Sequence, residues 1–324
     1  MTQRGAVSAA SEAIPAEMAG QFKAALDRLN AGEDRIGLAV SGGPDSLAML
    51  LLAHAAIPGR FAVATVNHGL RAEAADECAL VAQICAERGI ACDILRVEVA
   101  AGNVQAEARR ARYAALEAWA VERGLAAVAT AHHADDQAET LLMRLNRGSG
   151  LAGLAGVRST GAIGRLRVIR PLLDWRRAEL AAICRLAAIS PAQDPSNSNA
   201  DYDRVRIRQE LAQAGWLDPL ALARSARFLA EAEAFVEQTV EGEWLRRVTC
   251  EGQQWRFNPC DSAFANVEIV RRILRRLGGE VSRTDLARMV ERLAQGHSAS
   301  LAGVLARMDN GAWLFSPEPP RKSA

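Results

Sequence analysis

The 324-residue chain contains almost no lysine, although its formal net charge is +1. Lys23 and Lys322 are its only lysines, so arginine supplies nearly all of the 39 basic side chains. A P-loop NTPase needs a lysine directly after its phosphate-binding glycines, and neither lysine stands in such a place. The sequence therefore excludes a P-loop NTPase, while a net charge near zero neither indicates nor excludes a nucleic-acid partner.

Paired cysteines and long apolar runs are missing as well. None of the six cysteines belongs to a CxxC pair, which argues against a zinc ribbon or an iron–sulfur site and fits a reducing cytosol. No apolar run approaches the roughly 20 residues of a membrane span. The N-terminal residues lack the basic-then-apolar order of a signal peptide. These absences predict a soluble cytoplasmic protein with no membrane partner.

One stretch of small residues predicts a phosphate site. Ser-Gly-Gly-Pro-Asp-Ser lies between a short apolar run and an apolar helical pattern. Both glycines can adopt the positive φ of a tight strand-to-helix turn, and the proline suits the first helical position. The N–H groups of the first helical turn and the serine hydroxyls then face outward as an anion site. A glycine-rich linker is the alternative. The predicted phosphate-binding residues are Ser41, Gly42, Gly43, Pro44, Asp45 and Ser46.

Around this loop, apolar strands alternate with amphipathic helices. Continuously apolar strands predict a parallel sheet covered on both faces, so the expected class is α/β and Rossmann-like. Residues 148–165 are expected to form an irregular loop, and the chain after residue 204 is expected to be mainly helical. We therefore expect an α/β domain at residues 20–203 and a smaller, mainly helical domain at residues 204–324. The expected strands are residues 36–40, 61–66, 90–97, 126–129 and 166–169, and the later helices are residues 207–213, 220–248, 264–277 and 283–294.

Polar residues gather after the expected strand at residues 126–129. Two histidines, two aspartates and a glutamate lie within residues 130–140. Asp135 or Asp136 could cap the following helix, but a cap needs only one of them. Asp136 and Glu139 are three residues apart and share a helix face, which suits binding of a small ligand's amino groups. Neighbouring histidines cannot both reach one metal ion from a regular helix, so we expect no zinc site.

Basic residues suggest further contacts to phosphate. Arg109 and Arg112 share a helix face and are natural partners of a phosphate, although a salt-bridged surface helix has the same spacing. Between residues 144 and 185, nine arginines stand against two acids, as on a surface that binds a nucleic-acid backbone. A single arginine indicates little, because this chain uses arginine for almost every cation. His68, at another strand end, fits either a nucleotide contact or an ordinary loop.

Taken together, these motifs resemble one family. The glycine loop is similar to that of the PP-loop ATP pyrophosphatases, which have the adenine nucleotide α-hydrolase fold. Across residues 36–208, the motifs appear in the order typical of the tRNA(Ile)-lysidine synthetase family, which usually has asparagine where this chain has Val205. The matching motifs are residues 66–71, 108–113, 130–140, 142–145, 147–154, 170–173 and 194–197.

The resemblance implies a ligase that uses ATP, with Mg2+ carried by ATP and no metal bound by the protein alone. Its implied partners are free L-lysine and a tRNA(Ile) with a CAU anticodon, and a homodimer stays open. The wobble cytidine would be adenylated at C2 with release of pyrophosphate, and lysine would then displace AMP to give lysidine. The implied residues are Asp45, Arg112 and Asp136 for catalysis, Asp136 and Glu139 for lysine, and Arg204, Arg206 and Arg208 for tRNA.

Two other hypotheses remain at this stage. Another PP-loop adenylating enzyme is one, but a tRNA thiolase usually needs cysteine pairs, and an amidotransferase-type synthetase needs a glutamine-hydrolysing domain. A non-catalytic module that senses ATP is the other. It explains the glycine loop and leaves residues 130–140 and the basic stretch without a purpose.

Overall fold

The computed structural model describes residues 14–29, 34–69, 73–99, 102–192 and 203–318. Arg71 and the motif at residues 194–197 lie outside these ranges. The chain forms two compact units, Met1–Ala230 and Glu231–Ala324. This division falls later than the expected boundary at residues 203 and 204. The reason is that helix α9 (Asp203–Gln213) packs against helix α6 (Ala134–Asn146) within the first unit.

The first unit is built on a six-stranded sheet that contains the five expected strands and one further edge strand, β5. All neighbouring strands are parallel except the edge strand β5, which runs antiparallel to β6. The strand order is β3 (Cys92–Arg96), β2 (Phe61–Asn67), β1 (Ile36–Ala39), β4 (Val128–Ala129), β6 (Leu166–Ile169) and β5 (Thr160–Ile163). The order reverses between β1 and β4, where a doubly wound sheet opens a crevice for ligands at the carboxyl ends of its strands.

The expectation of an irregular loop at residues 148–165 is wrong. This segment contains the short helix α7 (Leu151–Leu154) and strand β5. Three of the four β5 residues are exposed, so the strand has no apolar alternation that a sequence pattern could reveal. The remaining helices of this unit are α2 (Ala16–Leu29), α3 (Pro44–Ala56), α4 (Glu73–Glu87), α5 (Val104–Glu122) and α8 (Arg177–Leu186).

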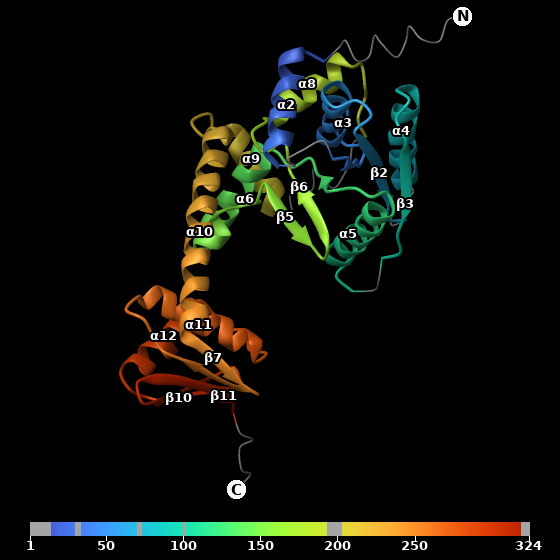
Figure 1. Cartoon of the computed structure of the whole chain (residues 1–324). Helices are drawn as coiled ribbons and strands as arrows, with labels where there is room; N and C mark the ends of the chain where they lie inside the picture. The colour runs from blue at the N-terminus through green and yellow to red at the C-terminus, as the bar shows by residue number, and fades with distance from the viewer. Residues whose placement is uncertain (1–13, 30–33, 70–72, 100–101, 193–202, 319–324) are drawn as a thin grey trace, which may run out of the picture. The chain divides into compact units, whose positions relative to one another are not determined.

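The sheet separates two apolar clusters because successive strand residues point to opposite faces. On β2, Phe61 and Val63 pack with α2, α3, α4 and α8, while Ala62 and Ala64 pack with α5. Figure 1 shows α2, α3 and α8 together beside the sheet. With both faces covered, functional groups can reach solvent only at the strand ends.

Helix α5 approaches the sheet especially closely at Gly37. A Cβ atom on this glycine would lie 2.4 Å from Cζ3 of Trp119. The indole Nε1–H of Trp119 donates to Asp93 of β3 at 2.7 Å, which fixes the ring against the strands. The missing side chain of Gly37 therefore sets the distance between α5 and β1.

The second unit combines helices with a sheet. The C-terminal part of α10 (Pro219–Arg247), α11 (Ala263–Arg276) and α12 (Arg283–Ala294) match the expected helices closely. The five-stranded antiparallel sheet was not expected. Its order is β7 (Val248–Glu251), β8 (Gln254–Phe257), β11 (Ala312–Pro317), β10 (Val304–Asp309) and β9 (Ala299–Leu301). Residues from both layers form its core, including Phe257, Ile273, Leu293 and Phe315.

No helix in the described ranges is long and apolar enough to cross a membrane.

Candidate active site

The glycine loop joins β1 to α3 and is held closed by its own serine. The backbone N–H of Ser41 donates to Ser46 Oγ at 3.1 Å, and Ser46 Oγ in turn donates to the carbonyl of Gly43 at 3.0 Å. Gly42 has a φ of +83°, so it needs the freedom of glycine. Gly43 does not, because its φ is −73° and it caps α3 in an extended conformation. Pro44 begins the helix as predicted, and the first N–H groups of α3 follow the loop directly, as an anion site at a helix N-terminus requires.

A pocket of about 470 Å³ opens beside this loop. Ligand pockets commonly have volumes of about 300–1,000 Å³. Its apolar lining includes residues at the ends of β1 and β2, whereas its polar groups come from the loop, from β2 and the residues after it, from α4 and α5, from the residues after β4, and from α9. The polar lining residues include Ser41, Asp45, Ser46, Thr65, His68, Glu77, Arg112, Thr130, His132, Asp136 and Arg204.

The cap of α6 is neither of the two aspartates considered as alternatives for it. His133 is the cap, since its Nδ1 accepts the backbone N–H of Asp136 at 3.4 Å. Asp136 completes a reciprocal pair by accepting the N–H of His133 at 3.1 Å. Asp135 accepts the backbone N–H of Arg177 at 2.8 Å and so ties α6 to the start of α8. Of the two aspartates, Asp136 is the one that lines the pocket.

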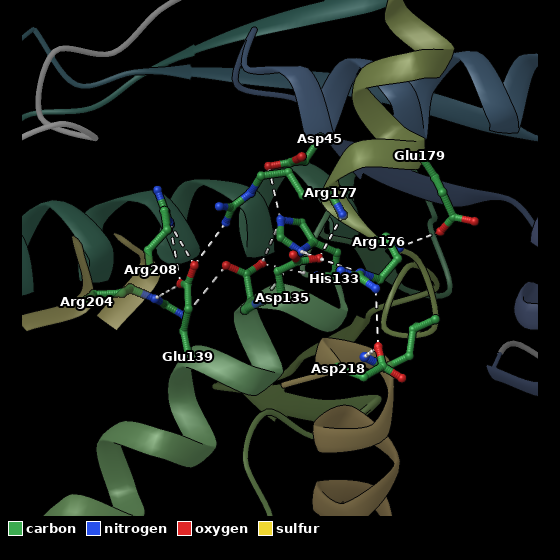
Figure 2. Close-up of polar contacts among 12 residues, drawn as sticks. Asp45, His133, Asp135, Glu139, Arg176, Arg177, Glu179, Arg204, Arg208 and Asp218 are labelled. Atoms are coloured by element: carbon green, nitrogen blue, oxygen red, sulfur yellow. Dashed lines mark hydrogen bonds and ion pairs between the residues drawn. The ribbon is translucent and has the colours of Figure 1, made fainter. Parts of the chain in front are cut away.

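Glu139 is fully buried and surrounded by arginines (Figure 2). Its carboxylate accepts from Arg177 at 3.1 Å, from Arg204 at 3.0 Å and from Arg208 at 2.8 Å. Arg204 also reaches Asp136, with 3.7 Å between its Nη2 and Oδ1. Glu139 is not among the described residues that line the pocket. The two carboxylates predicted for lysine are thus bridged by an arginine predicted for tRNA.

Arg112 reaches the pocket from α5. Its guanidinium lies 5.1 Å from the ring centre of Tyr113, and that of Arg109 lies 4.9 Å from the same ring. Tyr113 is buried, so it can act as a fixed platform for both cations. Within the described part of the chain, no carboxylate pairs with Arg109 or Arg112. Arg112 therefore brings to the pocket a positive charge that no described carboxylate pairs with.

The surroundings of the pocket histidines His68 and His132 lower the pKa of both and so favour the neutral form. Burial lowers the pKa of His132 to about 4; of the surrounding charges, Asp136 opposes this shift, while arginines such as Arg170 strengthen it. Thr130 Oγ1 lies 3.0 Å from Nδ1 of His132 and holds the ring in place. Burial, followed by the charge of Arg112, also lowers the pKa of His68. The positive charge of the pocket therefore comes from arginine.

Comparison with known proteins shows the family to which this chain belongs. A family model described as a PP-loop domain matches residues 16–215. A tRNA(Ile)-lysidine synthase from Novosphingobium aromaticivorans is 49% identical over 94% of this chain and 95% of its own length. The chain belongs to the tRNA(Ile)-lysidine synthase family. A second member, from Zymomonas mobilis, is 40% identical over 90% of each chain.

A solved structure shares the fold of this synthase family member. The U34-tRNA thiolase NcsA from Methanococcus maripaludis aligns with a TM-score of 0.54 at 18% identity, covering 66% of this chain and 79% of the thiolase. At that identity the likeness concerns the fold alone. It supports the expected adenine nucleotide α-hydrolase type of the first unit.

Several arginines of the basic stretch have structural partners in this synthase family member. Arg147 pairs with Asp203 at 2.7 Å, and Arg176 pairs with Asp218 at 3.2 Å. Arg170 is buried and donates to the carbonyl of Arg158 at 2.7 Å. The excess of arginines over acids between residues 144 and 185 therefore overstates the charge available to RNA.

Two features of the synthase site were missed in the sequence. Arg177 contacts Glu139 from the start of α8, and nothing in the spacing of the two residues indicates that contact. His133 was considered only as a metal ligand, although its position directly before the helix is a cap position. The described residues contain no group of three or more His, Cys, Asp or Glu side chains that could hold a metal ion.

Proposed function

We propose that this chain ligates free L-lysine to C2 of the wobble cytidine in the CAU anticodon of tRNA(Ile), by way of an adenylated tRNA. The names of its relatives support the reaction, and the PP-loop domain supports the use of ATP. The observation that carries the proposal is that one pocket is lined by the glycine loop after β1, by Asp136 at the start of α6 and by Arg204 of α9. We expect the reaction in the cytoplasm, where tRNA, lysine and ATP occur together.

In the first step, the C2 oxygen attacks the α-phosphorus of ATP and pyrophosphate leaves. The N–H groups at the start of α3 and the hydroxyl of Ser41 would hold the leaving phosphates. Arg112 lines the same pocket and would stabilise the negative charge that builds up on the transferred phosphate. Besides Ser41 and Arg112, Asp45 in the first turn of α3 is proposed to be a catalytic residue of this step. Mg2+ bound to the phosphates would supply further charge neutralisation.

In the second step, the ε-amine of lysine forms a bond to C2, the bond from C2 to the AMP oxygen breaks, and the amine loses a proton. Asp136 faces the pocket and is the first carboxylate proposed for the lysine amino groups. Glu139 is the second. Because Arg204 bridges these carboxylates and its side chain is 43% exposed, lysine can take over one of its contacts if this side chain turns outward.

The reaction can be tested with purified protein, ATP, labelled lysine and two tRNA(Ile) transcripts that differ only at the wobble position. We expect equal amounts of pyrophosphate and tRNA-bound lysine with the CAU transcript. The matched transcript with uridine at that position should accept no lysine. Pyrophosphate release that does not depend on tRNA would instead favour an ATP-using module with another substrate. Labelling of both transcripts would contradict the proposed target.

A further inference from the structure

A buried histidine lies between the phosphate loop and the predicted lysine carboxylates. His133 is 1% exposed and has acidic groups on both sides of its ring. Its Nε2 is 3.4 Å from Asp45 Oδ2 and 3.5 Å from Asp136 Oδ2, and its Nδ1 is 3.6 Å from Asp135 Oδ2. Figure 2 shows its ring between Asp45 above and the start of α6 below. No step of the proposed reaction uses this residue.

The capping contact decides which ring nitrogen carries the proton. Nδ1 accepts the backbone N–H of Asp136, so it must present a lone pair there. The proton of the neutral ring then belongs to Nε2, the nitrogen that faces Asp45. Helix α6 thus fixes the tautomer of His133, and the tautomer directs an N–H group toward the phosphate loop.

The position of Asp45 explains why its carboxylate needs to be restrained. Asp45 belongs to the first turn of α3, where the free N–H groups form the proposed anion site. A carboxylate that moved freely there would repel ATP phosphates across a few ångströms. Among the described residues, Asp45 Oδ1 and His133 Nε2 are both buried without a hydrogen-bond partner, so the 3.4 Å ion-pair contact between Nε2 and Asp45 Oδ2 is the one by which His133 can hold this carboxylate. Burial alone would lower the pKa of His133, but the contact with Asp45 and the charge of Asp136 raise it overall.

We propose that His133 is a positioning residue for Asp45, which restrains this carboxylate so that the loop can bind ATP in the geometry for attack on the α-phosphate. The proposal rests on the function proposed above for this pocket. His133 joins the start of α3 to the start of α6, so the ATP side and the lysine side of the pocket share one buried side chain.

The test replaces His133 by asparagine and by alanine. Asparagine is a favourable helix cap, so His133→Asn keeps an acceptor for the N–H of Asp136 but is too short to reach Asp45. His133→Ala loses both contacts. We expect both variants to lower the rate of tRNA-dependent pyrophosphate release about 10- to 100-fold, a loss typical of residues that orient a functional side chain. The KM for lysine should be unchanged. Only the alanine variant should also lose thermal stability.

A double substitution distinguishes action through Asp45 from a general packing effect. Binding of ATP is measured by calorimetry in the single variants and in Asp45→Asn combined with His133→Asn. If His133 acts through Asp45, the second substitution should change the ATP Kd little once Asp45 is altered. Wild-type ATP affinity and pyrophosphate rate in His133→Asn would overturn the proposal, and so would fully additive losses. A wild-type chain that binds ATP but releases no pyrophosphate with tRNA would overturn the proposed function, while the binding cycle would still test His133.

Discussion

At the scale of single residues, the site is governed by which charges are already paired. Glu139 has three arginine partners and is buried, whereas Asp136 faces the pocket and shares one of those arginines. The lysine binding proposed at this pair would therefore be an exchange between cations and not the filling of a free acidic site. In that case the affinity for lysine depends on the arginines as well as on the carboxylates.

Replacing Glu139 by glutamine should separate the two chemical steps. Each charged hydrogen bond lost should cost about 1.5–3 kcal/mol, a roughly ten- to hundredfold rise in the lysine concentration required. Formation of the adenylated tRNA does not involve the lysine amine and should persist. The measurement is adenylate formation without lysine, beside lysine incorporation as a function of lysine concentration. Because three partly exposed arginines lose the buried carboxylate that pairs with them, the free energy of unfolding should also fall.

A surface carboxylate provides the matched control for this substitution. Asp203 pairs with Arg147 and Arg206 at the start of α9, and its side chain is 48% exposed. Asp203→Asn should leave both the lysine curve and the unfolding free energy close to wild type. Equal loss of adenylate formation and lysine incorporation in Glu139→Gln would remove Glu139 from the lysine site.

At the scale of elements, α9 shows why three arginines predicted as one tRNA contact have different environments. Arg204 and Arg208 are four residues apart and share the face that meets α6, where both bind Glu139. Arg206 lies two residues from each and therefore points away; its side chain is 62% exposed and pairs with Asp203. Val205, where the family usually has asparagine, is buried, so this position faces the protein interior and not a polar ligand.

Charge reversal at Arg206 should affect tRNA binding without disturbing the site. If Arg206 contacts one RNA phosphate, Arg206→Glu should reduce the slope of log Kd against log salt concentration by about one. ATP affinity should be unchanged. Arg204→Glu, in contrast, should lower stability because it places a second carboxylate beside Glu139. An unaltered salt slope in Arg206→Glu would move the RNA surface to other residues.

Much of the site's architecture could be predicted from the sequence, because strand ends and turns leave local signals. The loop at residues 41–46 and the cluster after β4 were both found from their position beside apolar strands, and the pocket brings them together. The arginine partners of Glu139 could not be found, since a contact between α6 and α9 depends on tertiary packing. The register of α9 was missed because the helix was expected to begin at residue 207 and begins at Asp203.

At the scale of the whole molecule, the chain divides its apolar side chains between two units. The sheet of the second unit was missed although its turns carry a signal. Asn310 and Gly311 join β10 to β11, and both have positive φ, as the two-residue turn of a tight hairpin requires. Ala302 and Gly303 join β9 to β10 in the same way. Strands of three to six residues are too short to show a clear apolar periodicity, so they can be recognised only from the turns that join them.

Two separate cores predict that stability and ATP binding can be altered independently. Ile273 is fully buried in the core of the second unit, so Ile273→Ala should cost that unit about 2–5 kcal/mol. The phosphate loop belongs to the first unit and should bind ATP with wild-type Kd in this variant. Denaturant unfolding followed beside ATP titration provides the measurement. A parallel loss of ATP affinity would contradict the independence of the two units.

The close approach of α5 to Gly37 has a consequence for how sequence change reaches the pocket. Any side chain at this position would meet the ring of Trp119, and the ring belongs to the helix that also carries Arg112. Substitutions on the part of α5 that faces neither β1 nor the pocket leave this contact unchanged, whereas position 37 of β1 accepts only glycine. A substitution at Gly37 would lower the enzymatic activity as the loss of a catalytic residue does, although Gly37 is not among the residues that line the pocket.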